Sequence, residues 1–263
     1  MGAAPEDTES TIRIYVARPP EGVPIRGGCV VYFDIFGFGS GRTDHFCDDL
    51  AARGYVAICP DFFGRNLNGV SDFTDVLWPP WKIFTGAGSI FWRRMHYPYP
   101  VIEKKLLDVA LPFLRDKIGP DAPVGAVGFC WGAAAMVWSA ARNPAPYKAC
   151  VGVHPSMHVL ARQQCGPSIK EVLLAVNCPL LFMPCRGDPA AIREGGELWN
   201  IVLANSAARG SKNVPVTTQW HGFGTRADIR VPANKKDVDD MTELTIRFFD
   251  EVMLGITTEV VCR

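Results

Sequence analysis

Short, continuously apolar runs alternate along the chain with segments whose apolar residues recur at helical spacing. Such runs are typical of strands covered on both faces. The predicted strands cover residues 12–17, 29–34, 55–59, 124–129, 149–153, 180–183 and 214–220. Helical spacing fills residues 43–52, 102–117, 131–141, 168–176, 190–207 and 236–253. The alternation predicts an α/β fold with a mostly parallel central sheet and helices on both faces.

No stretch rich in Ser, Gly or Pro divides the chain, so we expect one domain over residues 1–263. Segment 61–100 breaks the alternation, because it is rich in aromatic residues, Gly and Pro and shows little periodicity. A long irregular excursion in a compact domain is usually functional or mobile. Two interpretations stay open for it, a wall or lid over a site and a surface segment packed on the sheet edge.

Composition excludes several classes of partner. The chain carries 27 Lys+Arg and 27 Asp+Glu, and without net positive charge we expect no nucleic-acid partner. No apolar run approaches the ~20 residues that span a bilayer, so we expect no membrane partner. Nine cysteines without a CxxC pair argue against a disulfide framework, and the first residues lack a signal-peptide pattern. We expect a cytoplasmic monomer or homodimer.

A cysteine flanked by glycines stands where a predicted strand meets a predicted helix, in the sequence GFCWG from Gly128 to Gly132. A G-x-nucleophile-x-G segment at such a junction is the nucleophile elbow. The glycines relieve crowding in a tight turn, and the helix N-terminus favours a thiolate and can bind an oxyanion. Most free cysteines are small buried apolar residues, and we assign the other eight of the nine cysteines to that class. Cys130 is the predicted nucleophile.

An acid and a histidine follow in the chain order that an elbow requires. Asp188 lies in the loop after the predicted strand 180–183, and His221 ends the strand 214–220 just before a glycine-rich loop. Asp188 would orient the imidazole of His221 and stabilise its charged form, and His221 would accept the thiol proton. The sequence therefore predicts the triad Cys130, Asp188 and His221.

These residues carry a resemblance to the dienelactone hydrolase family of α/β-hydrolases, whose members use Cys where most relatives use Ser. The matching segments are YFDIFG at 32–37, GY at 54–55, PDFF at 60–63, GFCWG at 128–132, HPS at 154–156, GD at 187–188 and HGF at 221–223. The resemblance implies an α/β-hydrolase fold and the same triad. It also implies an oxyanion hole formed by the backbone N–H groups of Trp131 and Ile35.

The resemblance implies roles for two further residues. Asp34 stands where the family's prototype has a glutamate that switches the thiol between resting and reactive states. Arg226 is the counterpart, one residue later, of an arginine that clamps the carboxylate of the substrate. A second clamping arginine precedes the elbow in the family, and three candidates for it stay open here, namely Arg65, Arg93 and Arg94.

We therefore expect a carboxylic ester hydrolase that cleaves a small, carboxylate-bearing ester or lactone, with no cofactor and no metal. Two alternatives stay open, a non-catalytic α/β-hydrolase scaffold and a thiol redox sensor. Scaffolds of this kind usually lack a member of the triad, and all three members are present here.

Two weaker signals point elsewhere. The glycine-rich loop 37–41 follows a strand as a dinucleotide-binding loop does, but Arg42 stands in place of the third glycine. A flexible loop beside the oxyanion hole explains these glycines as well. His154 and His158 have the spacing of a metal-binding pair on a helix, but Pro155 makes a helix through them improbable.

Overall fold

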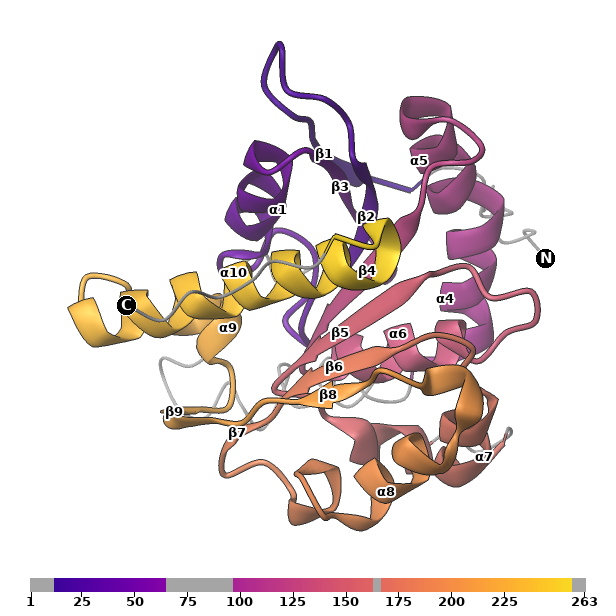
Figure 1. Cartoon of the computed structure of the whole chain (residues 1–263), viewed down its shortest axis with the longest axis vertical. Helices are drawn as coiled ribbons and strands as arrows, with labels where there is room; N and C mark the ends of the chain where they lie inside the picture. The colour runs from indigo at the N-terminus through magenta and orange to yellow at the C-terminus, as the bar shows by residue number, and fades with distance from the viewer. Residues whose placement is uncertain (1–11, 65–96, 163–166, 257–263) are drawn as a thin grey trace, which may run out of the picture.

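A computed structural model describes residues 12–64, 97–162 and 167–256 of the chain (Figure 1). Arg65, Arg93, Arg94 and most of segment 61–100 lie outside the described residues, so the predictions made for them stay predictions. The same holds for the division into domains.

The described residues form a seven-stranded sheet that is mostly parallel, as predicted. Only β1 runs antiparallel to its neighbour β3, and every other neighbouring pair is parallel. The order across the sheet is β1 Ile14–Ala17, β3 Tyr55–Pro60, β2 Gly27–Tyr32, β4 Val124–Phe129, β5 Ala149–Val153, β6 Leu180–Met183 and β8 Lys212–Asn213. Every residue of β2, β3, β4 and β5 is buried, as continuously apolar strands between two helical layers should be.

Helices cover both faces of this sheet. On one face, α10 (Pro232–Leu254) contacts β4, β5 and β6 and packs against α1 (Thr43–Ala52), which contacts β1 and β3. Figure 1 shows α10 in front of the strands and α6 (Trp131–Ala140) behind them. Around α6 lie α4 (Tyr99–Lys105) and α7 (Ile169–Ala175), and α7 packs on α8 (Glu197–Ala204). None of the helices in the described ranges is long and apolar enough to cross a membrane.

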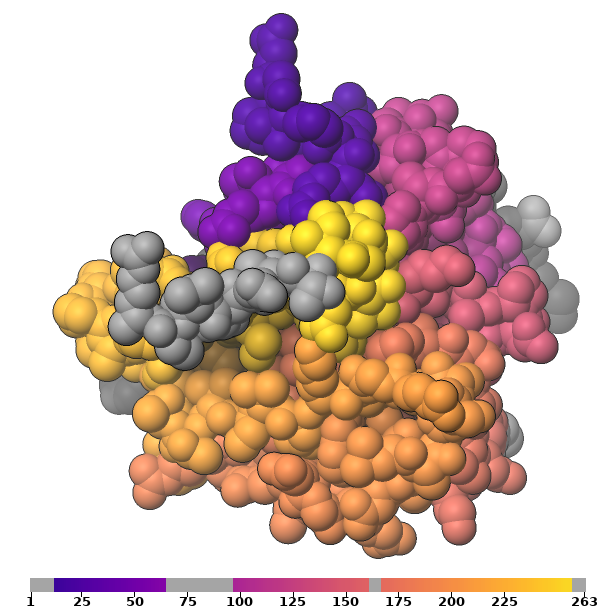
Figure 2. All heavy atoms as spheres, in the orientation of Figure 1, coloured from indigo at the N-terminus to yellow at the C-terminus, as the bar shows by residue number. Residues whose placement is uncertain are grey.

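Helix α10 is also tied to the opposite end of the chain by a buried polar cluster. The Tyr55 hydroxyl donates a hydrogen bond of 2.7 Å to Oδ1 of Asp250. The guanidinium of Arg26 lies 2.8 Å from the same oxygen. Since Arg26 directly precedes β2 and Tyr55 begins β3, Asp250 joins the last helix to the N-terminal strands. Figure 2 shows α10 on the outside of this face of the molecule.

The predicted strand 214–220 forms as β9 (Val216–Trp220), which begins two residues later and does not join the main sheet. The strand beside β6 in the main sheet is instead β8, which the sequence pattern does not predict. Strand β9 pairs in parallel with a two-residue strand β7 (Cys185–Arg186) in a second small sheet. Pro215 lies between the two strands, and because proline has no N–H to donate it interrupts the ladder.

Two predicted helices are also interrupted. Helix 190–207 consists of a 3-10 turn at Ala190–Ile192, α8, and a second 3-10 turn at Ser206–Ala208. Gly195, with a φ of 75°, breaks the helical path before α8. Helix 102–117 starts earlier, as α4 (Tyr99–Lys105), and continues through a π-helical segment Leu106–Ala110 into α5 (Leu111–Ile118). Pro112 lies just after this widened turn and has no N–H for the helical ladder.

Candidate active site

Cys130 lies at a strained turn between β4 and α6. Its φ is 54°, a left-handed backbone conformation that residues other than glycine rarely adopt. A Cβ atom at Gly128 would lie 2.5 Å from Cα of Ala133, and one at Gly132 would lie 2.3 Å from the carbonyl oxygen of Phe33. Both flanking glycines are therefore required, because side chains there would collide with main chain.

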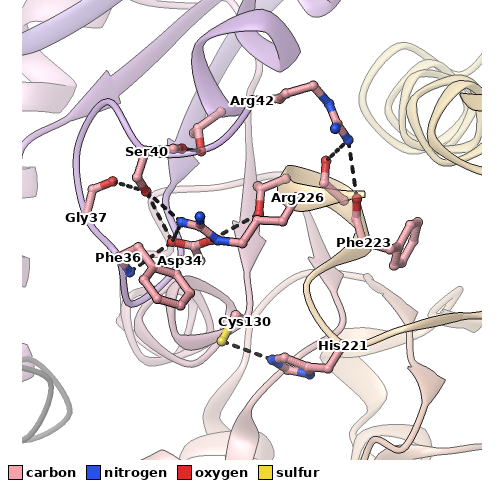
Figure 3. A network of polar contacts seen from close by, with 12 residues as sticks. Asp34, Phe36, Gly37, Ser40, Arg42, Cys130, His221, Phe223 and Arg226 are labelled. Atoms are coloured by element: carbon pink, nitrogen blue, oxygen red, sulfur yellow. Dashed lines mark hydrogen bonds and ion pairs between the residues drawn. The ribbon is translucent and has the colours of Figure 1, made fainter. Parts of the chain in front are cut away.

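The structure brings Cys130, His221 and Asp188 together in one line of contacts. Nε2 of His221 lies 3.1 Å from Sγ of Cys130, and Figure 3 shows the two side chains pointing toward each other. On the other side of the ring, Nδ1 lies 2.5 Å from Oδ1 of Asp188. The second oxygen of Asp188 accepts a hydrogen bond of 2.8 Å from the backbone N–H of Cys185. The carboxylate is thus fixed, and it orients the imidazole toward the sulfur.

The electrostatics of this line favour a charged imidazole beside a charged carboxylate. Burial by itself would lower the pKa of His221, but hydrogen bonds with Asp188 and Cys130 outweigh it and raise that pKa. Burial by itself would likewise raise the pKa of Asp188, yet the hydrogen bond from His221 leaves it lowered. His221 is therefore a strong acceptor for a proton released by the thiol.

Ser156 is a site residue that the sequence does not single out. Its Oγ lies 3.4 Å from Sγ of Cys130 and 3.4 Å from Nε2 of His221. Its backbone N–H also donates to the carbonyl oxygen of Cys130 at 3.0 Å. The only signal is its place in the HPS segment directly after strand β5, and a serine in a turn is too common to attract attention.

Trp131 and Ile35 both line the pocket that contains Cys130 and His221. Trp131 is the first residue of α6, so its backbone N–H has no acceptor within the helix. Ile35 follows β2 and lines the same pocket. The role of both backbone N–H groups as donors of an oxyanion hole stays a prediction.

The pocket has a volume of about 420 Å³ and is lined by both apolar and polar residues. Among the described residues that line it, none is Lys or Arg. The lining consists of Ile35, Phe36, Cys130, Trp131, Ser156, His158, Val159, Gly187, Asp188, Pro189 and His221.

The structure pairs Asp34 with Arg226 and does not bring Asp34 to Cys130. Nε of Arg226 donates to Oδ2 of Asp34 at 3.0 Å, and the hydroxyl of Thr225 donates to the same oxygen at 3.0 Å. The guanidinium lies over the ring of Phe36, 3.7 Å from its centre. In Figure 3 Arg226 reaches toward Asp34, apart from the contact between Cys130 and His221. The predicted roles of Asp34 as a thiol switch and of Arg226 as a carboxylate clamp stay predictions.

The glycine-rich loop 37–41 is docked on the short helix α9 (Phe223–Arg226), which begins two residues after His221. A Cβ atom at Gly41 would lie 2.7 Å from the carbonyl oxygen of Thr225. The backbone N–H of Arg42 donates to that same oxygen at 2.9 Å. The Arg42 guanidinium donates to the carbonyl oxygens of Phe223, Gly224 and Ala227 (Figure 3). The loop is therefore held against the helix that follows His221.

His154 and His158 do not form a helical pair. His154 directly follows strand β5, has a φ of 39° and is fully buried, whereas His158 belongs to a 3-10 helix at Met157–Arg162 and lines the pocket.

Comparisons with known proteins identify the family of this chain. The sequence profile of the Dienelactone hydrolase family matches residues 12–253. The human carboxymethylenebutenolidase homolog is 29% identical over 251 residues, which are 92% of this chain and 88% of that protein. An uncharacterized AIM2 family protein of Schizosaccharomyces pombe is 26% identical over 230 residues, 84% of this chain and 81% of that protein.

Solved structures share the fold. A dienelactone hydrolase from Anabaena variabilis is 14% identical, covers 92% of each chain and superposes with a TM-score of 0.61. A dienelactone hydrolase-like promiscuous phosphotriesterase from metagenomic libraries is 18% identical, with coverage of 92% of this chain and 98% of that one and a TM-score of 0.54. The predicted α/β-hydrolase fold is confirmed, and the chain is a hydrolase that belongs to the dienelactone hydrolase family.

Proposed function

We propose that this protein hydrolyses a small ester or lactone with Cys130 as the nucleophile. The observation that carries the proposal is the continuous contact from the sulfur of Cys130 through the His221 ring to Asp188, at the wall of a pocket. A nucleophile, a base and a group that orients the base, each within hydrogen-bond reach, are the parts that covalent acyl transfer requires.

The reaction follows from these positions. His221 accepts the thiol proton at Nε2 while the sulfur of Cys130 attacks the substrate carbonyl. The carbonyl oxygen gains negative charge, which the N–H groups of Trp131 and Ile35 would stabilise. His221 then returns the proton to the leaving alkoxide, and a thioester on Cys130 remains. A water molecule that loses its proton to His221 attacks the thioester, releases the acid and restores the thiol.

The pocket lining favours a small substrate with an apolar body. Its side chains near the sulfur include Phe36, Trp131 and Val159, and the described lining holds no Lys or Arg to pair with a carboxylate. A lactone fits the human relative, whose name refers to a butenolide. The expectation of a carboxylate on the substrate stays open, because Arg226 is occupied by Asp34.

Turnover of p-nitrophenyl acetate and of γ-butyrolactone by the wild type and by Cys130→Ala tests the proposal. We expect the substitution to lower kcat/KM by at least about a thousandfold, as loss of a covalent nucleophile does. Cys150→Ala is the matched control, since Cys150 is fully buried within β5 and is absent from the pocket lining. Full esterase rate in Cys130→Ala would exclude the mechanism.

The alternatives of a scaffold or a redox sensor are separated by the same experiment. A wild type inactive on every ester and lactone, with a Cys130 thiol that oxidises readily, would favour the redox sensor. If neither turnover nor thiol reactivity is found, the scaffold is favoured.

A further inference from the structure

His154 is a buried polar side chain with no partner. The residue has no exposed surface, and neither of its ring nitrogens has a hydrogen-bond partner in the described part of the chain. Leaving a buried donor or acceptor unpaired is destabilising, so such a group requires an explanation. Its backbone also lies in the left-handed region, at a φ of 39°.

The ring of His154 lies directly beside the predicted catalytic residues. It packs edge-on against the ring of His221, with 4.9 Å between the centres. One potential ligand atom from each of Cys130, His154 and His221 lies within 4.8 Å of the other two. These residues come from the elbow, the end of β5 and the loop before α9, so three separate segments converge on one point.

The chemistry of this trio is that of a zinc site. Thiolate sulfur and imidazole nitrogen are preferred ligands of Zn²⁺, and imidazole binds it in the neutral form. In a tetrahedral site with zinc–ligand bonds of about 2.0–2.3 Å, ligand atoms lie roughly 3.3–3.6 Å apart.

The required movements are small. Nε2 of His221 lies 3.1 Å from Sγ of Cys130, so this gap must open by about half an ångström. Any of the three pairs lies within 4.8 Å, so the farthest pair must close by at most about 1.5 Å. The side chain of His221 is 40% exposed, which leaves the ion a way in.

We infer that Cys130, His154 and His221 form a binding site for Zn²⁺ whose occupation switches the hydrolase off. On binding, Sγ of Cys130 and Nε2 of His221 lose to solvent the protons that they carry, and a lone pair from each atom goes to the metal. Nε2 of His221 is then a ligand and can no longer accept a proton. A water molecule or a group in the pocket takes the fourth position. Binding does not depend on the proposed esterase activity, but inhibition does.

A second trio, Cys185, Asp188 and His221, is also close enough to hold an ion. Its ligand atoms are already used, because Sγ of Cys185 donates to Asp188 at 3.2 Å and the other oxygen of Asp188 contacts His221. His154, by contrast, offers nitrogens that have no other partner among the described residues. The unpaired imidazole therefore assigns the ion to the first trio.

Titration of the purified chain with Co²⁺, a spectroscopic substitute for Zn²⁺, tests the site without any substrate. We expect wild type to show a thiolate-to-cobalt charge-transfer band and d–d bands of four-coordinate intensity, which Zn²⁺ then abolishes. Zn²⁺ affinity is measured by calorimetry. His154→Asn suits the left-handed backbone and removes one ligand. It should weaken Zn²⁺ by more than the roughly 10–100-fold that loss of an outer-shell partner costs.

Control variants make the assignment specific. Cys130→Ala should lose the charge-transfer band, and Cys185→Ala should keep it. Zn²⁺ should inhibit Cys185→Ala as strongly as it inhibits the wild type, and it should inhibit His154→Asn less. Each rate is normalised to the metal-free rate of the same variant. Unchanged Zn²⁺ affinity in His154→Asn, loss of the band in Cys185→Ala, or no band in the wild type would each overturn the inference. The cobalt spectra and the Zn²⁺ affinity need no substrate, so they test the site even if none of the chosen esters is hydrolysed.

Discussion

At the scale of single residues, Asp34 connects the loop after β2 with helix α9. The residue is only 2% exposed, and its carboxylate accepts hydrogen bonds from both segments. The donors are the backbone N–H of Phe36 and the hydroxyl of Ser40 on one side, and Thr225 and Arg226 on the other. A buried carboxylate satisfied in this way holds its surroundings in one arrangement. We therefore interpret Asp34 and Arg226 as positioning residues.

Arg226→Ala should impair the protein in the same way for all substrates. The substitution leaves the Asp34 carboxylate without its ion-pair partner, which should lower the free energy of unfolding by about 1–3 kcal/mol. We expect similar losses of kcat/KM on a neutral ester and on a carboxylate-bearing ester. Urea denaturation and parallel kinetics measure both effects.

The double variant Asp34→Asn/Arg226→Ala serves as the control, since it removes the unpaired charge and should be more stable than Arg226→Ala. A loss confined to the carboxylate-bearing ester, with stability unchanged, would instead restore the carboxylate clamp.

The sequence allowed the prediction of three site residues because each stands at the end of a strand. Parallel strands end at one edge of a sheet, so Cys130, Asp188 and His221 meet once the strand order is given. The contact between Asp34 and Arg226 spans 192 residues and depends on how two loops are routed. Local patterns contain no such information. The same reason hides the contact of Ser156 with the sulfur.

At the scale of elements, the loop 37–41 is held by its fit against α9. Gly39 and Gly41 both have positive φ, at 72° and 63°, so alanine is strained at either position. They differ in their surroundings, since a Cβ atom meets nothing within 4 Å at Gly39 but would lie 2.7 Å from the carbonyl oxygen of Thr225 at Gly41. Alanine substitutions at these two positions therefore distinguish the effect of backbone strain from the effect of losing the contact between the loop and α9.

Gly41→Ala should lower esterase kcat much more than Gly39→Ala does. The first change pushes the loop that carries Ile35 away from the helix that follows His221, whereas the second adds only backbone strain of roughly 1–2 kcal/mol. Thermal unfolding and steady-state kinetics on both variants measure the difference. Equal activity losses would show that docking of the loop is irrelevant to the site.

Proline and glycine mark two element boundaries that hydrophobic spacing alone does not show. Pro215 separates β8 from β9, and Gly195 precedes α8, yet hydrophobic spacing alone runs through both positions. The parallel pairing of β7 with β9 could not be predicted, because a two-residue strand has no periodicity.

At the scale of the whole molecule, Asp250 joins the C-terminal helix to the N-terminal strands through Tyr55 and Arg26. Asp250→Ala removes both interactions, and we expect it to lower the free energy of unfolding by about 1–3 kcal/mol. Asp250→Asn keeps an acceptor for Tyr55 and should cost less. Chemical denaturation of both variants measures this order.

Since Asp250 lies in α10 and is absent from the pocket lining, kcat at a temperature well below unfolding should stay at the wild-type value in both Asp250 variants. A drop in kcat without a drop in stability would contradict this separation of stability from activity.

The left-handed backbone at Cys130 restricts which nucleophilic side chains this position can carry. A β-branched side chain is strongly disfavoured at a φ of 54°, so threonine is excluded from the elbow by its second substituent on Cβ. Serine has the same branching as cysteine and meets no such obstacle. The backbone at this position is therefore compatible with a change from cysteine to serine, in evolution or in design. It is not compatible with a threonine nucleophile.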